Sequence, residues 1–423
     1  MRARPAVAAL ALITALVSTS GAVLSAGPGT DFEVEPVLKA ADLVDPTLLK
    51  GPHFTVDDRV PVKGLLARFT IQSDYGTFEA HGIHMLQIRV REVVALGQLD
   101  DMSKTKEFAE AAGKAIARPV TSTVNMVVHP VDTITGLPDG VGRLFDRVKL
   151  GSQRIAEAAT APDKGAGEKA ADVSKRVGAV TITALGYEKE RRDLAKGLGV
   201  DPYTTNEVLG KKLDDMAWVA FSGRFGVQTA MSVLVPYSMA MSAVTITNST
   251  VYDTPQGDLI NGDQAIFAGT GADDAKVQAL MRNTQYSLST LTALANGIHR
   301  LQGVTGRPRV VEFAAGAQTQ DETRFVAAAV NMLARYHESV EPLVEVTTPR
   351  PIVGRTMSGK LVIPAPVDYV AWTARVAAIS ERDDIRAPTR IAWLSGRVSP
   401  RARREFAARG WTVEENFSIA AER

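Results

Sequence analysis

The chain has no cysteine among its 423 residues. It therefore forms no disulfide bond, holds no thiolate metal site, offers no thiol nucleophile and carries no cysteine for lipid attachment after a signal peptide. Small disulfide-stabilised scaffolds are excluded for the same reason. A large exported protein without cysteine is more typical of a bacterial periplasm or secreted fraction than of an extracellular animal module.

The sequence also lacks an excess of charge of either sign. Its 48 Lys and Arg residues are matched by 47 Asp and Glu residues, for a formal net charge of +1. Without a long-range field to attract nucleic acid, we expect no nucleic-acid partner. Aromatic residues make up only 6% of the chain, but hydrophobic residues reach 45%. This hydrophobic content is enough for cores built mainly from Ala, Val and Leu, and the length predicts two or three domains.

Complete catalytic motifs are missing as well. There is no G-x-S-x-G, no P-loop, no H-E-x-x-H and no kinase signature. The densest group of possible metal ligands is Glu79, His81 and His84. A metal needs three or four converging donors, so we interpret these residues as a histidine pair at a solvated turn or hydrogen-bonded at a helix start. We predict no cofactor, no metal and no catalytic residue, and we favour a protein that is not an enzyme.

Residues 1–26 have the pattern of a secretory signal peptide. Two arginines precede an apolar run over residues 6–17, and small residues follow it. This run is too short to cross a bilayer, which needs about 20 apolar residues. We therefore expect cleavage after Ala22 or Ala26 and a periplasmic or secreted location.

Residues 225–251 form a second apolar segment, without a charged side chain and rich in Ala, Met, Val and Ser. Polar residues such as Gln228 and Ser232 lower its hydropathy below that of a typical membrane span. Its methionines suit an adaptable protein core. We favour a buried helix, and membrane contact is the alternative.

The first half of the chain predicts a hairpin joined to helices. Residues 27–63 are rich in Pro, Asp and Gly and are expected to form an extended lead-in. Residues 65–71 alternate between apolar and polar, and a turn sequence follows them, which predicts a β-hairpin. After Gly82 the apolar period becomes helical. Residues 64–250 are thus expected to form a hairpin attached to a mostly helical domain, in which Thr204 and Glu207 have the spacing of a capping box.

Residues 251–423 have a different pattern, in which short apolar runs precede segments whose apolar residues recur with helical periodicity. Strands alternating with helices of this length indicate an α/β layer. The predicted fold class is α+β overall, with a mostly helical N-terminal domain that contains a small β-hairpin, followed by an α/β C-terminal domain. The elements expected in this domain are strands at 310–313, 361–363, 390–394 and 411–413, a long helix at 277–298, and helices after the caps Thr319 and Ser399.

The loop at residues 395–399 is the main candidate for ligand binding. Ligands of α/β layers collect at the carboxyl ends of the strands, where helix N-termini present free N–H groups. Ser395, Arg397 and Ser399 would supply two hydroxyls and a cation there, and Thr319 would lie in the equivalent loop after an earlier strand. Together they are expected to hold a small anion such as phosphate or carboxylate, or else to serve only as turn and cap.

A second candidate is the segment that contains Asp368, Tyr369 and Trp372. The two aromatic residues are three positions apart and would share a helix face, where they could stack on a ring-shaped ligand. The alternative is core packing with the tyrosine hydroxyl satisfied.

These observations favour an exported, non-enzymatic protein that binds an unknown small anion or a protein partner, in a role such as envelope maintenance. One alternative is an enzyme whose site lies at the strand ends of the C-terminal domain. Another is a membrane-active or toxin-like protein.

Overall fold

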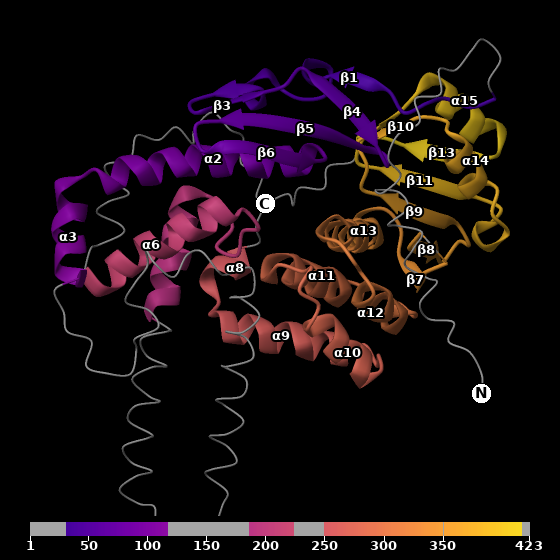
Figure 1. The fold of residues 1–423 in the computed structure, drawn as a ribbon. Coiled ribbons are helices and arrows are strands. Elements are labelled where there is room, and N and C mark those ends of the chain that lie inside the picture. The colour runs from indigo at the N-terminus through magenta and orange to yellow at the C-terminus, as the bar shows by residue number, and fades with distance from the viewer. Residues whose placement is uncertain (1–30, 117–185, 224–248, 350, 417–423) are drawn as a thin grey trace, which may run out of the picture. The chain divides into compact units, whose positions relative to one another are not determined.

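A computed structural model of the chain describes residues 31–116, 186–223, 249–349 and 351–416 (Figure 1). The backbone divides into two compact units. Unit 1 comprises residues 1–98, 195–210 and 235–423, and unit 2 comprises residues 99–194 and 211–234. The expected signal peptide at residues 1–26 lies outside the described residues, as does most of the apolar segment 225–251.

Unit 1 begins with a six-stranded antiparallel sheet. Its order is β1-β4-β5-β3-β2, and β6 pairs with β5. The short helices η1 (Ala40–Asp42) and η2 (Pro46–Leu48) lie between strands. The strands are β1 (Val37–Lys39), β2 (Lys50–Gly51), β3 (Phe54–Val56), β4 (Arg59–Lys63), β5 (Leu66–Ser73) and β6 (Gly76–His81).

The predicted fold class is wrong at this end of the chain. The N-terminal region consists mostly of strands, and the helices follow it. Residues 27–63, expected as an extended lead-in, contain β1 to β4. Each of these strands spans only two to five residues. Runs this short are difficult to distinguish from loop in a segment rich in Pro, Asp and Gly.

The hairpin of β5 and β6 is confirmed, and it packs on the helix α2 (Ile83–Ser103). Phe69 and Ile71 point from β5 into a core shared with Leu86 and Val90 of α2. Figure 1 shows α2 running along the sheet. Gly82 joins β6 to α2 with a φ of 101°, a left-handed conformation that costs glycine little.

The helices of the central part of unit 1 form a second core. The expected helix at 277–298 is two helices, separated by a break at residues 282–287. Within this break the side-chain amide of Asn283 donates hydrogen bonds to the backbone carbonyls of Ala315 and Ala317. The expected strand at 310–313 is also wrong. Gly306, with a φ of 86°, and Pro308 begin a helix there. The helices are α8 (Ser249–Asp253), α9 (Gln256–Ala268), α10 (Asp274–Met281), α11 (Leu288–Arg300), α12 (Arg307–Ala315) and α13 (Gln320–Ser339).

The C-terminal part of unit 1 is built on a five-stranded sheet of order β13-β11-β9-β8-β7. β9, β11 and β13 are parallel, whereas β8 is antiparallel to both of its neighbours. Val362 and Trp393 lie in the core with α13, while Ile363 and Leu394 pack with α14 and α15. The elements are β7 (Leu343–Thr347), β8 (Val353–Thr356), β9 (Leu361–Ala365), α14 (Ala374–Ser380), η4 (Asp383–Ile385), β11 (Arg390–Leu394), α15 (Pro400–Ala408) and β13 (Trp411–Glu414).

Two short strands, β10 (Tyr369–Val370) and β12 (Arg397–Val398), form a separate parallel pair. The strands expected at 361–363, 390–394 and 411–413 are confirmed, and so is the helix after Ser399. The Ser399 hydroxyl accepts a hydrogen bond from the Ala402 N–H at 2.9 Å, as a helix cap should.

Unit 2 is helical in its described part. It contains the end of α2, the helix α3 (Lys106–Ile116), residues of a helix at 186–198 and most of α6 (Glu207–Gly223). Ion pairs join Lys212 to Asp100 and Arg191 to Asp214. Across the residues with an assigned structure in both units, no helix has the length and apolar character needed to cross a membrane.

Candidate functional site

The side chains of the 395–399 loop are engaged within the protein. The Ser395 hydroxyl donates to the Val367 carbonyl at 2.8 Å, and Arg397 Nη2 donates to the Asp42 carbonyl at 2.6 Å. Ser399 caps α15 and donates to the Glu33 carboxylate at 2.5 Å. These contacts tie the loop to the N-terminal segment.

Thr319 is placed apart from this loop. It caps α13 by accepting a hydrogen bond from the Glu322 N–H at 3.2 Å. Because residues 310–313 are helical, the loop before Thr319 does not follow a strand. No hydrogen bond in the described part of the chain joins Thr319 to the 395–399 loop.

Asp368 connects the C-terminal part of unit 1 to the N-terminal sheet. Its carboxylate accepts hydrogen bonds from the Ala67 N–H at 2.8 Å and the Ile83 N–H at 3.2 Å. Burial raises the pKa of Asp368 to about 6, although these two hydrogen bonds and the charge of Arg68 oppose the shift. The carboxylate thus holds together the start of β5 and the start of α2.

Tyr369 and Trp372 differ in their surroundings. Tyr369 is partly exposed, and its N–H donates to the Leu65 carbonyl at 3.2 Å. Trp372 is only 1% exposed. Its ring stands edge-on to Phe406 at 5.2 Å, and the Arg409 guanidinium lies 4.7 Å from its centre. Trp372 therefore belongs to the core. The expectation that the two residues share a helix face is wrong, because Tyr369 lies in the strand β10 and Trp372 lies between β10 and α14.

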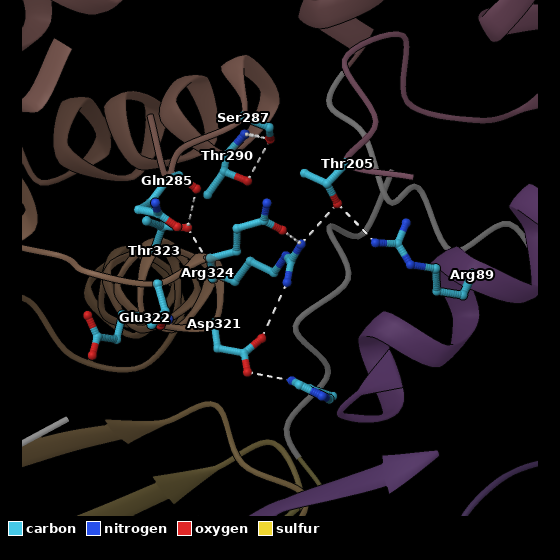
Figure 2. Close-up of polar contacts among 12 residues, drawn as sticks. Arg89, Thr205, Gln285, Ser287, Thr290, Asp321, Glu322, Thr323 and Arg324 are labelled. Carbon is cyan, nitrogen blue, oxygen red and sulfur yellow. Dashed lines mark hydrogen bonds and ion pairs between the residues drawn. The ribbon is translucent and has the colours of Figure 1, made fainter. Parts of the chain in front are cut away.

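A different group of polar residues meets where β5, β6, α2 and α13 come together (Figure 2). We call it the arginine cluster. It also includes the segment just before α6. Its members are Arg68, His81, Arg89, Glu92, Thr205, Asp321 and Arg324.

Asp321 is the centre of one half of the cluster. Its Oδ2 lies 2.5 Å from His81 Nδ1 and 3.3 Å from Arg68 Nη1, and its Oδ1 lies 3.4 Å from Arg324 Nη1. Arg68 and His81 reach it together because they are directly opposite each other in the β5–β6 hairpin. Burial raises the pKa of Asp321, but the hydrogen bond from His81 and the three nearby positive groups outweigh burial and lower it. Asp321 is thus ionised at neutral pH.

Thr205 is the centre of the other half. Arg89 Nη2 and Arg324 Nη2 each donate to the Thr205 hydroxyl oxygen at 3.0 Å, as Figure 2 shows. A hydroxyl oxygen has two lone pairs, so both are used by guanidinium groups. The pKa of Arg324 is lowered, first by burial and then by the charge of Arg89, although two carboxylates oppose the shift. Two like charges are therefore held around one neutral oxygen.

Glu92 keeps the Thr205 segment in place. It is 1% exposed and accepts hydrogen bonds from Arg89 Nη1 at 2.5 Å, Asn206 Nδ2 at 3.2 Å and the Thr204 hydroxyl. Asn206, rather than Thr204, caps α6, because it accepts from the N–H groups of residues 208 and 209. The expected capping box is wrong since the Thr204 hydroxyl is bound to Glu92 instead.

The three guanidinium groups of the arginine cluster are paired within the protein. Asp321 and Glu92 form ion pairs with them, and the charge of Arg68 also acts on the Asp368 carboxylate. Arg68 has a side chain only 10% exposed, and its Nε has no hydrogen-bond partner. A buried donor without an acceptor, close to two further guanidinium groups, is the feature of the cluster that favours an anion.

The residues noted in the sequence as possible metal ligands do not converge. His81 binds Asp321, and Glu79 accepts a hydrogen bond from Thr70 at 3.1 Å. The pKa of His84 is lowered to about 4, first by desolvation and then by the charge of Arg324. Within the described ranges, no three His, Asp or Glu side chains are placed to hold a metal ion.

No protein-family model, curated protein or solved structure matches this chain. The functional argument therefore depends on the geometry of the site. Sequence reasoning missed the arginine cluster, because His81 and Asp321 are 240 residues apart and no local motif connects them.

Proposed function

We propose that the chain is an exported, non-enzymatic protein that binds a small anionic ligand at the arginine cluster. The observation that carries the proposal is the single hydroxyl oxygen of Thr205, which accepts from both Arg89 and Arg324. Charge-assisted hydrogen bonds from arginine to phosphate or carboxylate are roughly twice as strong as those to a neutral acceptor. An anion beside Thr205 would give these guanidinium groups a second charged acceptor, in addition to Glu92 for Arg89 and Asp321 for Arg324.

The partners of Asp321 favour binding over catalysis. A catalytic histidine needs an orienting carboxylate and also a nucleophile or water held beside it. His81 has the carboxylate, but no described serine or threonine hydroxyl bonds to it. Asp321 also neutralises Arg68 and Arg324, as expected for a group that holds cations in place.

Arg324→Gln is expected to weaken anion binding about 10- to 100-fold, since a charge-assisted hydrogen bond contributes about 1.5–3 kcal/mol. Isothermal titration calorimetry with sodium sulfate, sodium phosphate and sodium acetate measures the effect. Arg309→Gln is the matched control, because Arg309 is an exposed arginine of α12. Equal affinities in the two variants, or no heat with any of the three anions in the unmodified protein, would refute the proposed site.

The proposed export predicts where the mature chain begins. The mature protein is expected to begin at Val23 or Gly27, after cleavage behind Ala22 or Ala26. Mass spectrometry of the protein recovered from the periplasmic and culture fractions of an expressing bacterium measures its first residue. Recovery of the intact chain, with Met1 still attached, in the cytosol alone would contradict export.

A further inference from the structure

A cavity of about 730 Å³ opens to solvent at the edge of the C-terminal sheet where β11 begins. It lies at the opposite end of β11 from the 395–399 loop, and none of its lining residues belongs to the arginine cluster. Sites of about 300–1,000 Å³ are typical for small organic ligands. Its walls come from the segment between α14 and β11, from the first residue of β11 and from the end of α15. They include Glu381, Arg386, Ala387, Pro388, Arg390 and Arg409.

Arg390 brings to this cavity a positive charge that no acidic side chain neutralises. Its Nη1 donates to the Ser380 carbonyl at 3.2 Å, and its Nη2 donates to the Arg409 carbonyl. Both acceptors are neutral, and among the described residues no carboxylate forms an ion pair with Arg390. A guanidinium group has five N–H donors, so three of those of Arg390 are left for a ligand.

The other two arginines have acidic partners but keep part of their donors. Arg409 donates to Glu381 through Nε at 2.8 Å and to Glu405 through Nη1 at 2.6 Å, which leaves its Nη2 without a printed acceptor in the described ranges. Arg386 pairs with Asp383 through Nε at 2.9 Å. That pair is weak because its side chains are 72% and 86% exposed. Arg386 can therefore offer both Nη groups to the two oxygens of a carboxylate.

Two of the arginines lie over aromatic rings. The guanidinium carbon of Arg390 is 4.7 Å from the centre of the Trp411 ring, and that of Arg409 is 4.7 Å from the centre of the Trp372 ring. Neither tryptophan lines the cavity, so the rings support these guanidinium groups from outside it. Because a guanidinium group is planar and stacks on aromatic faces, one that rests on a ring can accept a second ring on its other face.

We infer that this cavity binds a small organic acid in which a carboxylate is attached to an aromatic ring. The carboxylate accepts hydrogen bonds from Arg386 and from the remaining donors of Arg390, while the ring lies against the guanidinium groups and the apolar surface of Ala387 and Pro388. An inorganic anion would leave most of the volume unfilled, and an uncharged ring would leave Arg390 without a charged acceptor. This second site goes beyond the proposed function and does not depend on the arginine cluster.

Isothermal titration calorimetry of the full chain at about pH 7 with three probes tests the ligand class. Sodium 2-naphthoate carries both the ring and the carboxylate, sodium acetate lacks the ring, and 2-naphthalenemethanol lacks the charge. We expect 2-naphthoate to bind at least about tenfold more tightly than either of the others, since each of them loses one group of contacts.

Arg386→Gln is expected to weaken 2-naphthoate binding about tenfold, through the loss of charge-assisted hydrogen bonds. Arg386 is the arginine to change because it is exposed, whereas Arg390 holds two backbone carbonyls. Arg404→Gln is the matched control, at an exposed arginine of α15 outside the cavity. Ala387→Trp is expected to abolish binding, because the indole occupies the space of the ligand ring. Thermal unfolding shows whether each variant is folded.

The outcomes separate this site from the arginine cluster. Equal 2-naphthoate affinities in Arg386→Gln and Arg404→Gln, or no binding of 2-naphthoate at all, overturn the inference and leave the proposed function in place. Equal binding of acetate or of 2-naphthalenemethanol overturns the ligand class. In Arg324→Gln the affinity for 2-naphthoate is expected to be unchanged. Its loss there would place the acid at the arginine cluster, which contradicts the cavity site and supports the proposed function.

Discussion

Asp263→Asn is expected to raise the free energy of unfolding by about 2–4 kcal/mol at about pH 8 and to leave it nearly unchanged at about pH 3.5. Asp263 lies on α9 and is only 3% exposed. Its carboxylate accepts one hydrogen bond, from the Thr292 hydroxyl of α11 at 2.7 Å. Burial raises the pKa of Asp263 to about 7, although this hydrogen bond opposes the shift.

The sign of the pH effect follows from the raised pKa. Below the ordinary pKa of 3.8, Asp263 is protonated in both the folded and the unfolded chain. Between about pH 4 and 7 the unfolded chain loses this proton while the folded protein keeps it, so the stabilisation is lost as pH rises. Above about pH 7 the folded protein holds a buried charge, which the asparagine removes. The variant is therefore expected to gain stability over the parent progressively between about pH 4 and 7 and to keep the full gain above about pH 7.

Urea unfolding followed by circular dichroism across this pH range measures the effect. Asp258→Asn is the matched control, because Asp258 is an exposed residue of the same helix. That control is expected to lose about 0.3–1 kcal/mol, since Asp258 lies in the first turn where a negative charge is favourable. An Asp263→Asn variant no more stable than the parent at about pH 8 would contradict the assignment of a buried carboxyl.

Asp368→Ala is expected to lower the free energy of unfolding by about 3–5 kcal/mol, because two buried N–H groups would each lose a charged acceptor. These N–H groups belong to Ala67 and Ile83, at the starts of β5 and α2. The alanine leaves no other acceptor in their place. The loss is therefore expected in the N-terminal sheet in particular.

Hydrogen exchange of the backbone amides locates the loss, and urea unfolding gives its size. Asp368→Asn is the intermediate variant, since its amide oxygen still accepts one of the two hydrogen bonds. It is expected to lose about 1–3 kcal/mol. If Asp368→Ala unfolds at the same urea concentration as the parent, then Asp368 does not hold the sheet.

The sequence predicts those elements whose signals are local. The strand at residues 390–394 and the helix after Ser399 are found because an apolar run, a cap and a proline lie next to one another. The run at residues 310–313 has strand-like residues, but a glycine with positive φ and Pro308 before it start a helix. In that segment the tertiary packing of α12 overrides the β propensity of its valines.

The candidate site is predicted less well than the C-terminal strands. His81 is noticed in the sequence, but only as a possible metal ligand, because its true neighbour Asp321 is 240 residues away. Nothing in the local sequence distinguishes Arg68 and Arg324 from ordinary solvated arginines, because their shared partner Asp321 is reached only when the hairpin lies beside α13. Thr205 is missed because a hydroxyl shared by two guanidinium groups has no sequence pattern.

The N-terminal segment has consequences for the order of events during synthesis. The Glu33 N–H donates to the Trp372 carbonyl at 2.7 Å, and the Glu33 carboxylate accepts from the Trp372 N–H at 2.6 Å. Glu33 and Ala67 thus find partners in the C-terminal part of unit 1, and the acceptor of the Ala67 N–H is 301 residues further along the chain. A nascent chain that ends before Asp368 therefore lacks the anchor of its own first sheet. In such a chain the strands and the core that they share with α2 are already present, but the sheet is expected to open more readily than in the finished protein.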